Sequence, residues 1–137
     1  MLQAVHSDHR VFAELRILLV CSADEPELTR SLARDGHDVL VVDGEARARR
    51  LLRVFGPDVV LLYPAEEATV QRVRSESPGV TLVAIVADDV PEQRVAALDA
   101  GADDCVSEPF HHAELRARIR GAVRARGPRR RRSPQTA

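Results

Sequence analysis

The stretch PDVVLLY, residues 57–63, decides the fold of this chain. Gly56 and Pro57 end the helical pattern that precedes it, and residues 59–62 form a continuous apolar run. A run of this length between turn residues is typical of a strand that is covered on both faces of a parallel sheet. The sequence therefore predicts a buried strand that carries Tyr63 at its exposed end.

Outward from this stretch, apolar runs alternate with helical patterns five times. The predicted strands are residues 17–21, 39–42, 59–62, 80–86 and 104–107. The predicted helices are residues 25–35, 44–55, 66–76, 91–100 and 111–126. This alternation predicts an α/β fold with a doubly wound parallel sheet and helices on both faces. In the first helix, Leu28, Leu32 and Ala33 have the spacing of a core-facing stripe.

In such folds the binding or reaction site lies beyond the carboxyl ends of the strands, where the strand order reverses. The residues that this rule brings to one crevice are Cys21, Ser22, Tyr63, Val86, Ala87 and Glu108.

Length and composition bound the class of protein. The 137 residues suit one compact domain, and 45% hydrophobic with 30% charged residues is ordinary for a globular protein. The formal net charge of −1 excludes a global field that would commit the whole chain to nucleic acid or a membrane. All 20 basic residues are arginine, so no lysine is available to any site.

Three parts are predicted: a disordered extension (1–15), a folded domain (16–126) and a basic Pro/Gly/Arg linker or tail (127–137). Cys21 and Cys105 are far apart in sequence, which favours a reduced, cytoplasmic context. Residues 1–15 lack the apolar run of a signal peptide, and no later segment is long enough to span a bilayer. His6 and His9 are expected to belong to a solvated tail rather than to a metal site.

A second stretch, GADDCVSEPF at residues 101–110, is followed by Glu114-Leu115 and Ala117-Arg118-Ile119. Together with residues 57–63, this pattern resembles the response-regulator receiver domain of two-component signalling (CheY-like), and most of all the receivers of the OmpR/PhoB DNA-binding class. The resemblance covers roughly residues 16–125. It implies a flavodoxin-like sheet of five strands in the order 2-1-3-4-5.

The resemblance also implies a phosphorylation site whose parts differ in this sequence. Family members have an acceptor aspartate where Tyr63 stands, a lysine where Glu108 stands, and a Ser or Thr where Val86 stands. Phosphoryl transfer depends on positioning and on neutralising charge. A phenol is a poor acceptor and Glu108 would repel a phosphoryl group, so an atypical, degenerate receiver is expected. Tyr63 is expected to be non-functional as an acceptor and to pack as a wall of the crevice.

The acidic pair that holds Mg²⁺ in the family is replaced as well. Counted from the first strand, its positions are Cys21 and Ser22; counted back from the helix, a displaced Asp24 and Glu25 remain as the alternative. Mg²⁺ requires near-octahedral oxygen coordination with carboxylate support. No Mg²⁺, other metal, cofactor or enzymatic activity is therefore expected.

The signalling face that such receivers use for dimerisation has counterparts in the fourth helix, fifth strand and fifth helix. Plausible pairs across a two-fold axis are Arg94 with Glu114 and Asp104 with Arg118, and Ala97 and Leu98 would form the apolar centre. The alternative is a solvated charged face, since exposed pairs contribute only about 0–1 kcal/mol each. The predicted interface residues are Arg94, Ala97, Leu98, Asp103, Asp104, Glu114, Arg118 and Arg120.

Three functions remain to be distinguished. The first is a phosphorylation-independent receiver that forms a homodimer and regulates transcription, with DNA bound only through a C-terminal effector domain absent from this chain. The second is a small-molecule-sensing pseudo-receiver that uses the crevice around Tyr63, Cys21, Val86 and Ala87. The third, an enzyme, lacks any Gly-rich phosphate loop or nucleophile–base pair in the sequence. A membrane partner is not expected.

Overall fold

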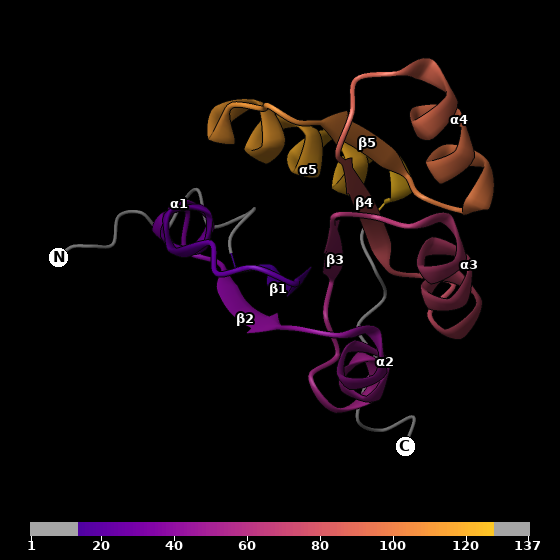
Figure 1. Cartoon of the computed structure of the whole chain (residues 1–137). Coiled ribbons are helices and arrows are strands. Elements are labelled where there is room, and N and C mark those ends of the chain that lie inside the picture. The colour runs from indigo at the N-terminus through magenta and orange to yellow at the C-terminus, as the bar shows by residue number, and fades with distance from the viewer. Residues whose placement is uncertain (1–13, 128–137) are drawn as a thin grey trace, which may run out of the picture.

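Five parallel strands form one sheet in the order β2-β1-β3-β4-β5, as predicted (Figure 1). The computed structural model describes residues 14–127, so most of the extension, most of the tail, and His6 and His9 lie outside the described residues. The strands are β1 (Arg16–Cys21), β2 (Asp38–Val42), β3 (Val59–Tyr63), β4 (Thr81–Val86) and β5 (Asp104–Ser107).

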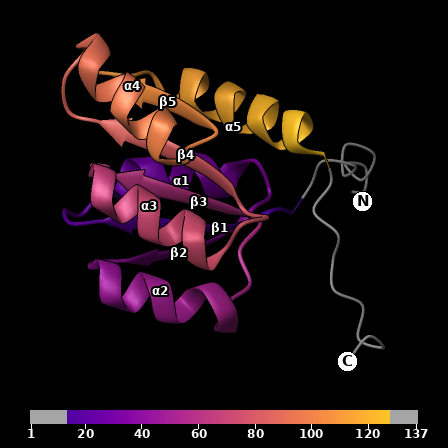
Figure 2. The ribbon, with the colours of Figure 1, turned by 90° about the vertical axis from the view of Figure 1, so that its right-hand side faces the viewer.

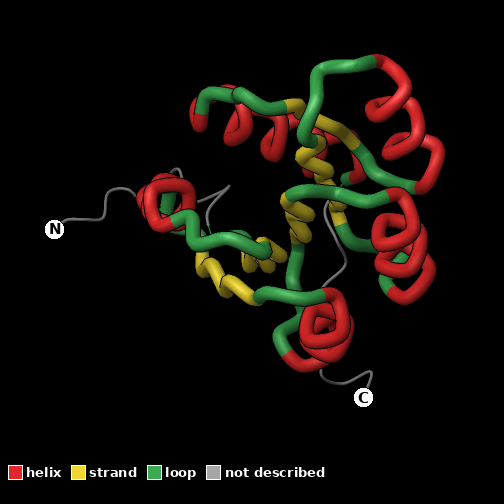
Figure 3. Tube along the Cα trace, in the orientation of Figure 1, coloured by secondary structure: helices red, strands yellow, loops and turns green. Residues whose placement is uncertain are grey.

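A helix follows each strand, and the helices cover both faces of the sheet (Figures 1 and 2). The helices α1 and α5 pack on one face, and α2, α3 and α4 pack on the other. Loops and helices alternate with the strands throughout, as Figure 3 shows. The helices are α1 (Pro26–Arg34), α2 (Glu45–Val54), α3 (Glu67–Glu76), α4 (Pro91–Ala100) and α5 (His112–Arg126).

The central strands are buried because both of their faces are covered. In β1, Ile17 and Leu19 point toward α1 and α5, while Leu18 and Val20 point toward the other three helices. This alternation is the period of two that a strand imposes. It explains why β1, β3 and β4 are apolar throughout rather than alternating with polar residues.

The α1 stripe was predicted only in part. Leu28 and Leu32 are buried, but Ala33 is exposed, because it lies beyond the narrow face that α1 turns to the sheet. Within the described residues, no helix is long and apolar enough to cross a membrane.

Arg74, near the end of α3, ties together the amino-terminal edge of the sheet. Its guanidinium donates to the backbone carbonyls of Gly101 (2.9 Å) and Val80 (2.8 Å) and to the carboxylate of Asp103 (2.8 Å). Asp103 also accepts from the Leu82 N–H at 2.8 Å and from Arg126 at 3.0 Å. We call Arg74, Asp103 and Arg126 the amino-edge clamp.

The clamp favours the charged form of Asp103. Burial alone would raise the pKa of this carboxyl group, but the hydrogen bonds from Arg126 and from the Leu82 N–H outweigh burial and hold the pKa below its usual range. Asp103 was predicted at a dimer interface. In the structure it is occupied by partners of its own chain that join α3, β4 and α5 to the start of β5.

Candidate functional site

The carboxyl edge of the sheet brings Tyr63 and Glu108 together. Tyr63 is the last residue of β3 and lies opposite Cys21 of β1. Glu108 follows β5, and its backbone N–H donates to the Val86 carbonyl at 3.0 Å, which fixes it beside β4. The Tyr63 hydroxyl donates a short hydrogen bond to the Glu108 carboxylate. Tyr63 and Glu108, the residues expected at the acceptor and lysine positions of the family, are therefore hydrogen-bonded directly to each other.

Local electrostatics keep this hydrogen bond in the form of a phenol donor and a carboxylate acceptor. Burial, followed by the bond to Glu108, raises the pKa of the Tyr63 hydroxyl above its usual range. The ring also meets Phe110 edge-on, with 5.8 Å between ring centroids. A protonated phenol held in this way is a poor nucleophile and a poor metal ligand.

Val86 closes the crevice without adding a polar group. Its side chain is buried in the core, at the end of β4 opposite Ser107. Next to it, the Ile85 carbonyl accepts a hydrogen bond from the Ala65 N–H at 2.8 Å, so the loop after β3 runs directly across β4. At the position where the resemblance implies a Ser or Thr hydroxyl, the structure therefore has the apolar side chain of Val86.

The candidate acidic pair lies on the far side of the crevice. Cys21 is buried, and its thiol donates to the Ala23 carbonyl at 2.9 Å. Burial raises the pKa of this thiol, so the thiolate is disfavoured. Ser22 and Asp24 are exposed, and Glu25 is half-buried where α1 begins. In residues 14–127, no group of three or more His, Cys, Asp or Glu side chains is arranged to hold a metal ion.

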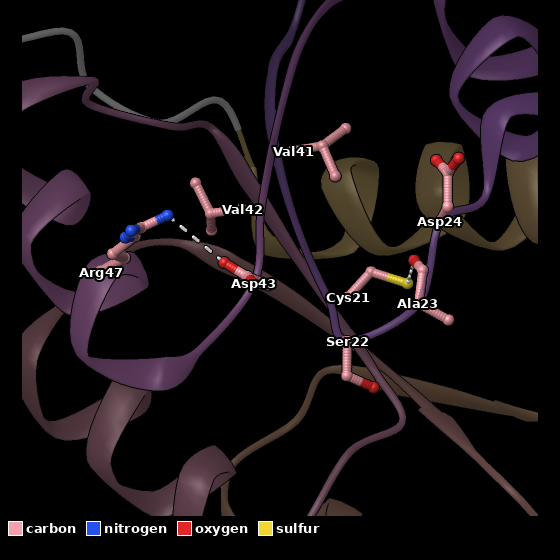
Figure 4. A pocket seen from close by; sticks show the side chains of 8 residues that line it. All are labelled: Cys21, Ser22, Ala23, Asp24, Val41, Val42, Asp43 and Arg47. Atoms are coloured by element: carbon pink, nitrogen blue, oxygen red, sulfur yellow. Dashed lines mark hydrogen bonds and ion pairs between the residues drawn. The ribbon is translucent and has the colours of Figure 1, made fainter.

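A hollow of about 320 Å³ opens between the ends of β1 and β2 (Figure 4). Asp43 and Arg47 form an ion pair at its rim, with 3.4 Å between their charged atoms. The hollow shares Cys21 and Ser22 with the predicted crevice but does not include the other predicted residues, Tyr63, Val86, Ala87 and Glu108. Its lining residues are Cys21, Ser22, Ala23, Asp24, Val41, Val42, Asp43 and Arg47.

The predicted signalling face contains ion pairs within the single chain. Arg118 of α5 lies 3.3 Å from Asp104 of β5 and 3.3 Å from Glu114. Arg94 of α4 pairs with Asp89 in the preceding loop. These charges have alternative partners inside the chain, so pairing across a two-fold axis would require an exchange of partners.

Two further interface predictions need correction. Ala97 is only 4% exposed and packs into the core, whereas Leu98 is 45% exposed; Leu98 alone of the two is available as an apolar centre. Arg120 lies on the side of α5 that faces α1. Burial lowers the pKa of the His37 imidazole, and the nearby Arg120 lowers it further. Arg116, one turn earlier in α5, pairs with Asp35 after α1. The helical phase separates Arg120 from Glu114 and Arg118.

Comparison with known proteins agrees with this geometry. No family model matches the chain. It is 34% identical over 121 residues to the response regulator MprA of Mycobacterium sp. (strain KMS), covering 83% of this chain and 53% of that protein. It is 33% identical over 113 residues to the probable transcriptional regulatory protein TcrX of Mycobacterium tuberculosis, covering 76% and 48%. The chain belongs to the receiver domains of response regulators.

This receiver domain spans about half the length of the curated relatives it matches. Solved structures support the fold. HP1043, an orphan response regulator of H. pylori, superposes with a TM-score of 0.71 at 21% identity, over 79% of this chain and 95% of that one. The receiver domain of the Francisella response regulator 1452 gives a TM-score of 0.68 at 20% identity, over 82% and 99%.

Sequence reasoning located the crevice of this receiver domain but missed one residue that shapes it, Phe110, and one residue of the amino-edge clamp, Arg74. Phe110 supplies the ring that meets Tyr63, and its place after Glu108-Pro109 was visible in the family motif. Arg74 had no sequence signal, because its acceptors are mostly backbone carbonyls distributed over three segments.

Proposed function

We propose that this receiver domain works without phosphorylation of its crevice and passes its signal through self-association. The observation that carries the proposal is the hydrogen bond from Tyr63 to Glu108. An incoming phosphoryl group would have to displace this bond and would then face the Glu108 carboxylate. No lysine exists in the chain to offset that charge.

The same hydrogen bond makes the link across the crevice that a bound phosphoryl group would otherwise make. It links the end of β3 to the residue after β5, and the Glu108 N–H continues the link to the Val86 carbonyl of β4. Three strand ends are thereby joined without any ligand. We infer that the crevice holds one fixed arrangement rather than switching with phosphate.

Intact mass spectrometry after incubation with acetyl phosphate and Mg²⁺ tests the proposal. We expect the mass of the wild-type chain to stay unchanged, while a receiver with the usual acceptor aspartate, treated in parallel, gains a phosphoryl group. The Tyr63→Phe variant is the matched control, because it removes the hydroxyl and keeps the ring. An adduct on an acidic residue of the wild type, or an adduct on Tyr63 that Tyr63→Phe abolishes, would contradict the proposal.

Self-association is proposed through the face formed by α4, β5 and α5. Support comes from the exposed Leu98 beside the charged groups Arg94, Asp104, Glu114 and Arg118, a mixture that can complement itself about a two-fold axis. We expect light scattering at high micromolar concentration to give a dimer for wild type and a monomer for Arg118→Glu. Arg50→Glu on α2 is the control and should remain dimeric; equal monomer masses for all three proteins would reject the interface.

Transcription control is proposed because one relative, TcrX, is named as a probable transcriptional regulatory protein, and both TcrX and MprA are about twice the matched length. DNA would then be bound mainly through an effector domain that these residues do not include. The corresponding test is a reporter assay of the receiver fused to such a domain, with Arg118→Glu as the variant that should lose regulation.

The hollow between β1 and β2 supports a second candidate, a small-molecule sensor. This hollow combines apolar Val41 and Val42 with the polar rim of Asp24, Asp43 and Arg47. A metabolite screen by thermal melting would test it, with Val42→Phe to fill the hollow. A ligand whose stabilisation survives Val42→Phe would argue against this site.

A further inference from the structure

The helix α5 of this receiver domain carries a strong excess of positive charge, and its neighbour α1 adds to it. The 15 residues of α5 contain five arginines and one acidic residue, Glu114, although the whole chain has a formal net charge of −1. The nine residues of α1 add Arg30 and Arg34 against a single acidic residue, Glu27. On the other face of the sheet, α2 also carries four arginines and one acidic residue, but Arg47 and Arg49 pair with Asp43 and Glu76.

The two helices present these arginines on one side of the molecule. Both helices cover the same face of the sheet, and Arg116 joins them through Asp35 at 3.1 Å and through the Ser31 hydroxyl at 2.6 Å. Arg120 and Arg124 follow Arg116 at four-residue spacing, which places successive guanidinium groups about 6 Å apart along the helix. Figure 2 shows α5 along the upper part of the view.

Four of these side chains are exposed and have no ion pair or side-chain hydrogen bond within residues 14–127. They contrast with Arg118 and Arg126, which are paired to Asp104 and Asp103. We call the four exposed residues the α1–α5 arginine face: Arg30, Arg34, Arg120 and Arg124.

The chemistry of this face favours phosphate over a protein surface as its partner. Among the described residues, the exposed large apolar side chains are on other elements, and none belongs to α1 or α5. A stable protein interface needs an apolar or aromatic centre, which this face lacks. Guanidinium groups match phosphate oxygens in two-pronged hydrogen bonds, and duplex DNA presents about one negative charge per 1.7 Å of its axis.

We propose that the α1–α5 arginine face binds the phosphate backbone of duplex DNA without reading its sequence. This inference rests on the proposed role in transcription control, and extends it: the receiver itself would contact DNA beside a site held by the effector domain. Residues 129–132, four consecutive arginines, follow α5 in sequence and add a second basic segment to the chain.

Fluorescence anisotropy with a labelled 20-base-pair duplex, titrated at several salt concentrations, tests the proposal. Each neutralised phosphate contributes roughly 0.9 to the slope of log K against log salt. We expect Arg120→Gln/Arg124→Gln to lower the magnitude of that slope by about 2, and the addition of Arg30→Gln/Arg34→Gln to lower it by about 2 more. Arg50→Gln/Arg53→Gln on α2, also exposed and on the other face of the sheet, is the matched control.

A second series of variants measures the contribution of residues 129–132 separately from that of the α1–α5 arginine face. In this series the four arginines Arg129, Arg130, Arg131 and Arg132 are all changed to glutamine. Residual binding that still depends on the α1–α5 arginine face supports the proposal. Three results overturn it: binding that disappears entirely with residues 129–132, equal losses for the α2 control, or no DNA binding alongside binding to phosphatidylserine vesicles. Circular dichroism should show all variants folded. A phosphoryl adduct in the mass experiment would overturn the proposed function while leaving these slopes unchanged.

Discussion

The two edges of the sheet are held in different ways. At the carboxyl edge, the Tyr63–Glu108 hydrogen bond and the bond from the Glu108 N–H to the Val86 carbonyl join three strand ends, and the Tyr63 ring meets Phe110. At the amino edge, Arg74 and Asp103 satisfy one another and several backbone groups as well. Stability and the chemistry of the crevice are therefore separable. Several side-chain hydrogen bonds hold the amino edge, whereas one side-chain hydrogen bond, from Tyr63 to Glu108, holds the carboxyl edge.

The largest expected effect is at Gly101, where α4 ends beside the amino-edge clamp. Gly101 has φ +129°, and an added Cβ would lie 2.8 Å from Cγ of Arg74. Gly101→Ala should therefore lower the free energy of unfolding by roughly 3 kcal/mol, through backbone strain and displacement of Arg74. Urea denaturation measures this, with Gly79→Ala as control because its added Cβ meets no atom within 4 Å. Similar midpoints for the two variants would show that the clamp tolerates movement.

Removal of the clamp carboxylate comes next. Asp103→Ala leaves the Leu82 N–H and the Nη2 group of Arg74 without their acceptor, so we expect a loss of about 2 kcal/mol. Asp99→Ala, on the exposed side of α4, should change the unfolding midpoint little. If Asp103→Ala were instead neutral in stability but defective in self-association, its predicted interface role would be restored.

At the carboxyl edge the effect should be smaller. Tyr63→Phe removes one hydrogen bond and leaves Glu108 free to reach water, so about 1 kcal/mol should be lost. Tyr63→Leu removes the ring contact with Phe110 as well and should be less stable than Tyr63→Phe. Equal stability of wild type and Tyr63→Phe would mean that the bond to Glu108 contributes nothing to the fold.

The smallest expected effect depends on pH. His37 accepts a hydrogen bond from the Leu15 N–H at Nδ1 (3.2 Å), and burial lowers its pKa below 6.5, helped by Arg120 and opposed by Asp35. Below pH 6.5 the unfolded chain therefore binds a proton that the folded chain resists. Stability should fall as pH drops from 6.5 toward the folded pKa, and then level off.

Urea midpoints across this pH range measure the effect. His37→Asn, whose side-chain oxygen can accept the same bond, should flatten the slope, whereas the exposed control His111→Gln should keep it. A wild-type slope that His37→Asn leaves unchanged would assign the pH dependence to other groups.

The fold was predictable because its signals are local. Apolar runs such as residues 59–62, the helix start at Pro91 and the helix stop at Gly101 determine the elements to within one or two residues. The helical phase was harder to predict, so Ala33 was wrongly placed in the core and Ala97 at the surface. Arg120 was placed on the wrong side of α5 for the same reason, since a motif gives the order of residues but not the direction of each side chain.

The sequence predicted which residues lie in the candidate site, but it did not predict the hydrogen bonds between them. Tyr63 and Glu108 were brought to one crevice by strand order alone, 45 residues apart in sequence. Their direct hydrogen bond depends on side-chain length and rotamer, which no sequence pattern specifies. The clamp at Arg74 was missed because its partners are carbonyl groups that every residue carries.

Tyr63 is also the only tyrosine in a chain that has no tryptophan. The Tyr63 ring is therefore the main source of the intrinsic ultraviolet fluorescence. The Glu108 carboxylate, which accepts a hydrogen bond from the Tyr63 hydroxyl, quenches that fluorescence. Opening of the crevice should make the protein brighter, with no label attached. Tyr63 therefore provides an optical reporter in the crevice of the receiver domain.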